Sequence, residues 1–387
     1  MTFALDVTAL VLSLAAAMCA WRSCRWLSRQ RAQGPPETNG EGIVSGPVPL
    51  VSLLVPARNE ERNIEACLRG LLAQCHARCE VILLDDASSD ATAAIVARVL
   101  AEQASSARLV AGRPLEAGWG GKCFACHQLA ELAQGEWLLF LDADTRLAPD
   151  AVMRALAAAR VAGVELASFL PRYVGDAWPN RLVVPWLYFF LTALVPLPEV
   201  ARLPYPRLSV ANGQAILVRR DAYARSGGHA GIRDHIVEDV SLAIAAKRAG
   251  LRIALLDGHR WLRCEMYDSG RALAAGFAKS FHSAARRYPL QWAALLTLLV
   301  LIGFRPWLRV FAAGTDAERL LALASIALVG VTFAGLLVRF RQGLGALLVW
   351  PLTLWALLAI AVAGGVSGLL GRELAWRGRP VGGRAPS

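Results

Sequence analysis

The sequence predicts an α/β domain with a mostly parallel sheet flanked by helices, together with transmembrane helices at both ends of the chain. Strand-like and helix-like segments alternate from about residue 49 to residue 287. Long apolar runs lie before and after this region, and hydrophobic residues occupy 56% of the 387 positions. That share is high for a soluble protein and indicates a membrane protein with one large domain.

The first element is an apolar run over residues 3–21, which is interrupted by Asp6 and is long enough to cross a bilayer. No basic stretch precedes it, which argues against a cleaved signal peptide. Basic residues follow at once, namely Arg22, Arg25, Arg29 and Arg31. We therefore expect a membrane anchor over residues 1–21 and a basic, Gly- and Pro-rich linker over residues 22–48, with the following domain in the cytoplasm.

The predicted domain covers residues 49–287. Its expected strands include residues 51–56, 80–85 and 136–142, and its expected helices include residues 64–73 and 92–103. Polar or acidic residues follow each of these three strands. Because ligands bind beyond the carboxyl ends of parallel strands, we expect these residues to meet at one edge of the sheet.

The third strand ends in Asp142-Ala143-Asp144. Two carboxylates at this spacing suit a hard divalent cation, which prefers oxygen ligands and can neutralise a departing diphosphate. Asp142 and Asp144 are therefore the predicted ligands of Mg²⁺ or Mn²⁺. The alternative is an ordinary surface turn, because this pattern is common by chance.

The two earlier loops are predicted to bind a nucleotide. Acids at a strand end can hydrogen-bond a base edge and a ribose hydroxyl. Helix capping by Ser88, Ser89 and Asp90 is the alternative for the second loop. The candidate donor-binding residues in these loops and at the third strand are Pro56, Arg58, Asn59, Glu60, Asp85, Asp86 and Asp142.

These elements, followed by Val237-Glu238-Asp239-Val240, resemble the family 2 inverting glycosyltransferases. That family has Pro-x-x-Asn-Glu, Asp-Asp-x-Ser-x-Asp, Asp-x-Asp and Glu-Asp in this order, and four ordered motifs are specific where one would be weak. The resemblance implies a nucleotide-diphospho-sugar transferase (GT-A type) fold and a single displacement. It makes Asp239, beside Glu238, the catalytic base. The alternative for this pair is a favourable helix N-terminus.

Further motifs resemble the membrane-bound subgroup that acts on hydroxylated carotenoids, hopanoid-associated lipids and ceramide. They include Gly118-Trp119-Gly120-Gly121-Lys122 and Ala211-Asn212-Gly213-Gln214. The hydroxychlorobactene glucosyltransferase type is most similar, and the hopanoid-associated type comes second. The resemblance implies that Lys122 contacts donor phosphate, with a solvated loop lysine as the alternative. Asn212, Gly213 and Gln214 are assigned to the acceptor side.

The expected reaction is inverting transfer of a hexose, expected to be glucose, from a nucleotide sugar such as a UDP-hexose to a hydroxyl of a carotenoid or hopanoid-like membrane lipid. A polyprenyl-phosphate or ceramide-type sugar transferase is the enzymatic alternative. A membrane scaffold with a vestigial nucleotide-binding domain is the alternative outside enzymes. No zinc-finger spacing or recognition helix accompanies the net charge of +11, so no nucleic-acid partner is expected.

Two further segments are candidates for the acceptor side. Residues 183–197 are apolar and aromatic, and Trp186 and Tyr188 suit an interfacial segment at the bilayer surface, with a buried core helix as the alternative. The Gln-x-x-Arg-Trp motif of processive relatives is missing after the base. The candidates to replace it are Lys279, His282 and Arg286, and its absence argues against a polymer synthase.

The last third of the chain, residues 288–371, is predicted to be a membrane region with two or three helices. Residues 320–338 and 344–370 are each long enough to span. Residues 290–304 are shorter and are cut by Arg305-Pro306, which predicts a short span or an interfacial piece. Residues 372–387 form a basic tail. We therefore expect a multi-pass protein of the inner membrane whose domain faces the cytoplasm.

Overall fold

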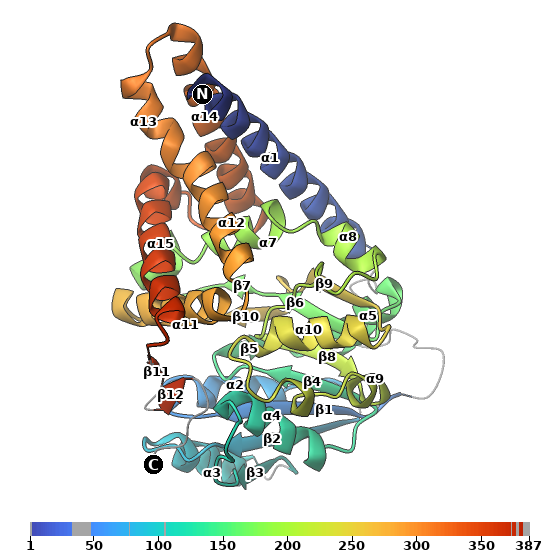
Figure 1. The fold of residues 1–387 in the computed structure, drawn as a ribbon. Coiled ribbons are helices and arrows are strands. Elements are labelled where there is room, and N and C mark those ends of the chain that lie inside the picture. Colours follow the sequence, from blue (N-terminus) through green and yellow to red (C-terminus); the bar gives the residue numbers. More distant parts are fainter. Residues whose placement is uncertain are drawn as a thin grey trace. The chain divides into compact units, whose positions relative to one another are not determined.

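A computed structural model of the chain describes residues 2–32, 48–76, 78–103, 106–372, 374–376 and 379–381 (Figure 1). The chain divides into two compact units, each made of segments that are far apart in the sequence. The helical unit comprises residues 1–25, 173–196 and 266–374. The sheet unit comprises residues 26–172, 197–265 and 375–387.

A seven-stranded sheet forms the centre of the sheet unit (Figure 1). Its strands are β1 (Val51–Ala57), β2 (Cys79–Asp85), β3 (Arg108–Ala111), β4 (Trp137–Leu141), β6 (Leu166–Leu170), β8 (Ala215–Arg219) and β9 (Ile253–Asp257). They are ordered β3-β2-β1-β4-β8-β6-β9, and β8 runs antiparallel to both of its neighbours. The other neighbouring pairs are parallel, so the predicted mostly parallel sheet is confirmed.

The central strands consist of nearly unbroken apolar residues. Leu53 and Leu54 of β1 point to opposite faces of the sheet, and both are fully buried. This is expected for parallel strands that are covered on both faces. The strand register sets Ala57 opposite Asp85, and Leu54 opposite Phe140. The carboxyl ends of β1, β2 and β4 therefore lie at one edge, with the polar residues that follow them.

Helices and short turns connect these strands. They are α2 (Ile64–Leu72), α3 (Thr92–Glu102), α4 (Gly121–Leu132), α5 (Ala151–Ala162), α8 (Leu197–Arg202), α9 (Arg220–Arg225), the 3-10 turn η1 (Ala230–Ile232) and α10 (Glu238–Arg248). Two short strands, β5 (Thr145–Leu147) and β10 (Leu262–Cys264), pair antiparallel beside the main sheet. The helices expected over residues 64–73 and 92–103 correspond to α2 and α3.

The helical unit contains most of the long apolar helices. Its elements are most of α1 (Thr2–Ala32), α6 (Trp178–Leu182), α7 (Trp186–Ala193), α11 (Gly270–Arg287), α12 (Pro289–Leu299), the π turn η2 (Val300–Phe304), α13 (Arg305–Ala312), α14 (Asp316–Arg339) and α15 (Ala346–Leu369). Short strands β7 (Arg172–Tyr173), β11 (Leu374–Trp376) and β12 (Arg379–Val381) complete the described elements. In the part of the chain that the structure describes, four helical segments are long and apolar enough to cross a membrane: Thr2–Gln30, Pro289–Ala312, Asp316–Arg339 and Ala346–Leu369.

Two predicted boundaries differ from the structure. Residues 22–32 were expected in a linker, but α1 continues to Ala32. Arg305-Pro306 was expected to cut the next apolar run, but helix continues through η2 into α13 and reaches 24 residues. Pro306 stands just after the π turn η2, where the helix departs from the regular α-helical hydrogen-bond pattern. The rest of the linker, residues 33–47, and most of the basic tail lie outside the described residues.

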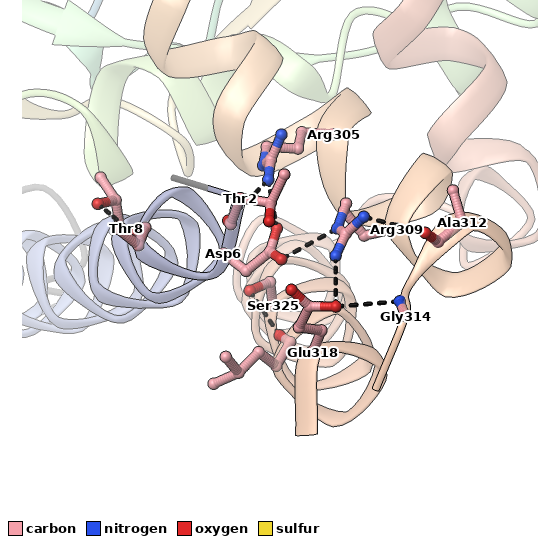
Figure 2. A network of polar contacts seen from close by, with 11 residues as sticks. Thr2, Asp6, Thr8, Arg305, Arg309, Ala312, Gly314, Glu318 and Ser325 are labelled. Carbon is pink, nitrogen blue, oxygen red and sulfur yellow. Dashed lines mark hydrogen bonds and ion pairs between the residues drawn. The ribbon is translucent and has the colours of Figure 1, made fainter. Parts of the chain in front are cut away.

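An ion-pair network accommodates Asp6, the acidic residue inside the first apolar run (Figure 2). Asp6 is 3% exposed, and its carboxylate contacts Arg305 at 2.7 Å and Arg309 at 3.0 Å. Arg309 also contacts Glu318 at 2.8 Å. This network of Asp6, Arg305, Arg309 and Glu318 joins α1, α13 and α14. Mutual pairing of this kind is what allows charges to remain within an apolar helix bundle.

Glycines of α15 allow it to approach α11 closely. A Cβ atom at Gly364 would lie 2.7 Å from the carbonyl oxygen of Ala278, and one at Gly368 would collide with the carbonyl oxygen of His282. Small residues at helix crossings have this effect in membrane proteins. A larger side chain at Gly364 or Gly368 would force the two helices apart.

Candidate active site

The loops that follow β1 and β2 are locked to each other by Asn59. Its N–H donates to Ser88 Oγ at 3.0 Å, and its Oδ1 accepts from the N–H of Ser89 at 2.8 Å. Asn59 has a φ of +54°, a left-handed conformation that Asn tolerates better than most residues. Arg58 donates to the carbonyl oxygen of Ala87 at 3.0 Å. In this structure both residues, predicted to bind the donor, hold the two loops together.

Acidic residues of these loops also make loop contacts. The carboxylate of Asp85 accepts from the N–H of Ser88 at 3.4 Å, as in a turn-forming Asp. Asp86 is 6% exposed, and its N–H donates to the carbonyl oxygen of Ala57 at the end of β1. Both alternatives weighed for this motif, capping and ligand binding, can hold for different residues.

A residue that the sequence did not single out links β5, just after β4, to the loop that follows β1. Arg146 follows the Asp-x-Asp element and donates to Asn63 Oδ1 at 3.0 Å. Asn63 in turn donates to Glu60 Oε2 at 3.3 Å. Arg146 therefore positions the loop after β1 against the end of β4. Its position two residues after Asp144 is the feature of the sequence that could have identified Arg146 as a residue of the site.

Lys122 joins acids from two different elements. Its Nζ lies 2.6 Å from Asp142 Oδ1, at the end of β4, and 2.5 Å from Glu238 Oε1, in the first turn of α10. Burial opposes the charge of the ammonium, but Asp142 and Glu238 outweigh it and hold the pKa of Lys122 well above its usual value. Lys122 is therefore charged at all ordinary pH values.

The position of Lys122 depends on contacts between α4 and the loop before α10. The N–H of Gly120, which precedes α4, donates to the carbonyl oxygen of Arg233 at 2.6 Å. The thiol of Cys123 donates to the carbonyl oxygen of His235 at 3.3 Å. These bonds hold the first turn of α4 against the segment that leads to Glu238, which explains why Lys122 meets this residue.

Gly213 brings the remaining acid into the same place. A Cβ atom there would lie 3.3 Å from Asp239 Oδ2, 3.4 Å from Lys122 Nζ and 3.5 Å from Glu238 Oε1. Only a residue without a side chain leaves the space beside these three groups open. We call Asp142, Asp144, Glu238 and Asp239, with Lys122, the carboxylate cluster.

Two acids of this cluster have a raised pKa. Burial raises the pKa of Asp239 to about 7, and the adjacent Glu238 carboxylate adds to the shift. Burial likewise raises the pKa of Asp144 to about 7, and the Asp142 carboxylate acts in the same direction. Groups that titrate near neutrality are suited to proton transfer and to cation binding.

The residues present fit a divalent cation that takes part of its shell from elsewhere. Asp144 Oδ1 is buried and accepts no hydrogen bond from the described residues. No group of three or more His, Cys, Asp or Glu side chains among the described residues is arranged to hold a metal. Mg²⁺ and Mn²⁺ commonly bind through one or two carboxylates together with waters and substrate phosphates. Asp142 and Asp144 could supply such a pair.

Residues 52–227 match the family model described as glycosyl transferase family 2. This part of the chain is a family 2 glycosyltransferase domain. The match includes the three strand-end motifs and Lys122, and it confirms the resemblance drawn from them.

Relatives and a solved structure agree with this assignment. The 4,4'-diaponeurosporenoate glycosyltransferase of Staphylococcus haemolyticus is 28% identical over 235 residues, which are 59% of this chain and 60% of that protein. The protein of the same name from Staphylococcus aureus is 27% identical over 61% of each chain. The similarity thus spans about three fifths of these relatives. A mannosyltransferase of Pyrobaculum calidifontis, solved with GDP-Man and Mn²⁺, superposes with a TM-score of 0.57 at 20% identity, covering 96% of this chain and 100% of that one. It confirms the GT-A-like fold.

In the glycosyltransferase domain and the segment that follows it, the structure collects most of the predicted site residues. Gln214 lies beside the cluster, since its carbonyl oxygen accepts from the N–H of Asp142 at 3.2 Å. The side-chain Oε1 of Gln214 is buried and has no hydrogen-bond partner among the described residues. Asn212 is anchored by Ser168, whose Oγ bonds both its N–H and its carbonyl oxygen. Gln214 therefore has an acceptor group available for a ligand.

The aromatic residues predicted at the membrane surface lie elsewhere. Trp186 and Tyr188, on α7 of the helical unit, are both fully buried. Their rings stack on Phe333 and Phe340 of the helical unit, at 4.3 Å and 4.0 Å between centroids. The interfacial interpretation of Trp186 and Tyr188 is corrected accordingly: they form a packed core, the alternative that the sequence left open.

Lys279 and His282 lie on α11 of the helical unit. His282 is fully buried, and its two ring nitrogens have no partner among the described residues. Burial lowers the pKa of His282, so its imidazole is neutral at pH 7. A neutral buried ring is a weaker candidate than Lys279 for contact with a diphosphate.

Proposed function

We propose that this chain transfers a hexose from a nucleotide sugar to a membrane-lipid acceptor, with inversion at the anomeric carbon. The carboxylate cluster is the observation that carries the proposal. It places two candidate metal ligands, a candidate base and a lysine within one site of a glycosyltransferase domain. The proposed acceptor is a carotenoid-type or similar polyisoprenoid lipid.

The donor side of the proposal rests on Asp142, Asp144 and Lys122. Asp142 and Asp144 would hold Mg²⁺ or Mn²⁺, which supplies positive charge for the diphosphate leaving group when bound. Asp86, buried at the edge next to β1, is the candidate for contact with the nucleoside. A UDP-hexose is the proposed donor, and a GDP-sugar is the alternative to test, because the similar mannosyltransferase was solved with GDP-Man.

The acceptor side rests on Asp239. Its carboxylate would take the proton of the acceptor hydroxyl while that oxygen forms a bond to the anomeric carbon. The bond from this carbon to the diphosphate oxygen breaks on the opposite face, and the electron pair leaves with the diphosphate. A pKa of about 7 leaves a substantial fraction of Asp239 ionised at neutral pH while keeping it a stronger base than an exposed Asp.

The names of the relatives favour a second acceptor chemistry. They are named for 4,4'-diaponeurosporenoate, a carboxylate. A carboxylate acceptor carries no proton to remove, so Asp239 would then position the acceptor rather than act as a base. Transfer by Asp239→Asn separates the two cases, because a hydroxyl acceptor requires the base and a carboxylate acceptor does not.

The membrane location follows from composition and charge. Among the described residues, four helical segments are long and apolar enough to span, and the basic residues after the first apolar run favour a cytoplasmic glycosyltransferase domain. We propose that the protein is a multi-pass component of the inner membrane. A lipid-soluble acceptor is consistent with such a location.

The test is transfer by the purified full chain. Radiolabelled UDP-glucose and GDP-mannose are each supplied with Mg²⁺ or Mn²⁺ and either a hydroxylated or a carboxylated carotenoid, and label in the lipid phase is measured. Mass spectrometry of lipids from cells with and without the protein identifies the natural product. A folded protein that neither transfers nor hydrolyses any donor would favour the scaffold alternative and refute the proposal.

A further inference from the structure

Asp142 and Glu238 come from different elements, yet both contact one ammonium group. We propose that Lys122 is an internal counter-ion, which neutralises these two acids in the empty enzyme and moves to the donor diphosphate when metal and donor bind. The inference rests on the proposed function of the carboxylate cluster. It assigns Lys122 a second task, control of metal binding, in addition to contact with phosphate.

The geometry sets the ammonium in competition with a metal ion. Lys122 Nζ lies 2.6 Å from Asp142 Oδ1, an atom of the predicted metal pair. The other member of the pair, Asp144, keeps its Oδ1 without a partner among the described residues. The lysine therefore contacts one of the two predicted metal ligands and leaves the other without this contact. A divalent cation at Asp142 would be repelled by the ammonium unless the ammonium moved away.

The residue type favours a group that moves. Of the 41 basic residues in the chain only three are lysines, Lys122, Lys247 and Lys279. Elsewhere the chain uses arginine, whose planar guanidinium would clamp carboxylates in a fixed geometry. A lysine ammonium is compact, carries three donors and ends a flexible stem. The Lys122 side chain is 37% exposed, so part of it faces solvent and is not enclosed by packing.

The position at the start of α4 also favours exchange. A cation in the first turn of a helix meets the positive end of the helix dipole, so Lys122 is held there by the acids. A diphosphate near this turn would attract the ammonium and be attracted by the helix. Transfer of Lys122 from Asp142 to phosphate would then release the carboxylate to the metal. Metal and donor would consequently strengthen each other's binding.

Binding of Mn²⁺ alone to the purified full chain tests the competition. The free Mn²⁺ signal is measured by electron paramagnetic resonance for the unaltered protein, Lys122→Met, Lys122→Gln and Lys122→Arg. Loss of the positive charge in the Met and Gln variants should tighten Mn²⁺ binding about tenfold, whereas Lys122→Arg should not tighten it. Arg219→Met, which removes an exposed charge at the far end of β8, serves as the control for net charge.

The affinity for nucleotide should change in the opposite direction to the affinity for Mn²⁺. UDP and GDP are titrated into each variant with Mn²⁺ present. Lys122→Met should bind the preferred nucleotide about tenfold or more weakly, because a charge-assisted contact to phosphate is lost. The nucleotide should raise Mn²⁺ affinity more in the unaltered protein than in Lys122→Met. Tighter metal binding together with weaker nucleotide binding is the signature of an exchanging counter-ion.

Magnetic resonance of the unaltered sequence provides a test that does not depend on a change of affinity in a variant. Reductive methylation with a carbon-13 label gives signals from the three lysines and from the N-terminal amine, and Lys122→Arg identifies the signal of Lys122. Mg²⁺ with the nucleotide should shift this signal more than those of Lys247 and Lys279. An unmoved signal, or equal Mn²⁺ affinity in folded Lys122→Met and the unaltered protein, overturns the inference. If the unaltered protein binds neither nucleotide with metal, the proposed function itself fails.

Discussion

The ion-pair network of the helical unit and the carboxylate cluster of the sheet unit are both groups of buried or half-buried charges, and they differ in charge balance. The ion-pair network of the helical unit combines two carboxylates with two guanidinium groups (Figure 2). The carboxylate cluster of the sheet unit combines four carboxylates with the ammonium of Lys122. The network can satisfy its charges internally. The cluster carries excess negative charge, which favours added cations. Burial raises the pKa of Asp144 and Asp239, and the neighbouring carboxylates add to the shift.

This difference separates a structural role from a chemical one. Both groups consist of acidic and basic side chains on segments far apart in the sequence. When every buried charge is paired within its own group, the group stabilises the packing of the helices that carry it. Removal of one partner would leave a buried charge unpaired. A group with excess negative charge is suited to bind a ligand that supplies positive charge. Charge balance therefore supports a structural role for the network and agrees with the catalytic role proposed for the cluster.

Removal of metal should have the largest effect and should affect only the cluster. A chelator should abolish measurable transfer, and Mg²⁺ or Mn²⁺ should restore it, because the diphosphate loses its counter-charge. The ion-pair network contains no metal site, so thermal unfolding of the chelated protein should show the helical unit unchanged. Full transfer in the presence of chelator would contradict the assignment of Asp142 and Asp144.

Asp239→Asn should produce the next largest loss. It is nearly isosteric but cannot accept a proton, and general base catalysis contributes about 10²–10⁴-fold to a rate. Transfer to a hydroxyl acceptor should fall by this factor while calorimetric donor binding changes little. Glu238→Gln is the matched neighbour and should reduce transfer less. A loss of donor binding as large as the loss of rate would remove Asp239 from the role of base.

Asp6→Asn should destabilise the helical unit without affecting the chemistry. It leaves Arg305 and Arg309 short of a partner, which we expect to cost about 2–3 kcal/mol of unfolding free energy. The matched control is Asp316→Asn, since Asp316 is 93% exposed and pairs with Arg319 at the surface. Denaturant unfolding and transfer per folded molecule are measured for both. Equal stability of the two variants would show that the network does not hold the helices.

Acid should weaken the sheet unit by a smaller amount through His229. Burial lowers the pKa of this imidazole to about 3, below its unfolded value near 6.5. The unfolded state therefore binds more protons between these values, so stability is complete above pH 6.5 and falls as the pH decreases. Between pH 7 and pH 5 the loss should be about 1–2 kcal/mol. His229→Gln should make the unfolding free energy depend less on pH between pH 7 and pH 5. An unchanged slope would show that His229 does not cause the loss of stability.

The strand-end acids could be predicted because sequence order fixes where a parallel strand ends. Asp142 and Asp144 follow an apolar strand, and the parallel register of the sheet brings them to the same edge as the loops after β1 and β2. The contact of Lys122 with Glu238 could not be predicted in this way. It depends on Gly120 and Cys123 binding the backbone before α10, and such contacts leave no periodic pattern in the sequence.

Apolar aromatic segments were the main source of error for the same reason. The segment around Trp186 and Tyr188 has the composition of a bilayer-surface helix and of a buried helix alike. Stacking on Phe333 and Phe340 decides between them, and these partners lie far along the chain. The π turn before Arg305 is likewise a local geometry that composition does not reveal.

The ion-pair network also bears on how the chain can be shortened. Asp6 of α1 contacts both Arg305 and Arg309 of α13. Removal of α1 would take away the acid that these two guanidinium groups share within apolar helices. A shortened protein that keeps α13 should therefore keep α1 as well.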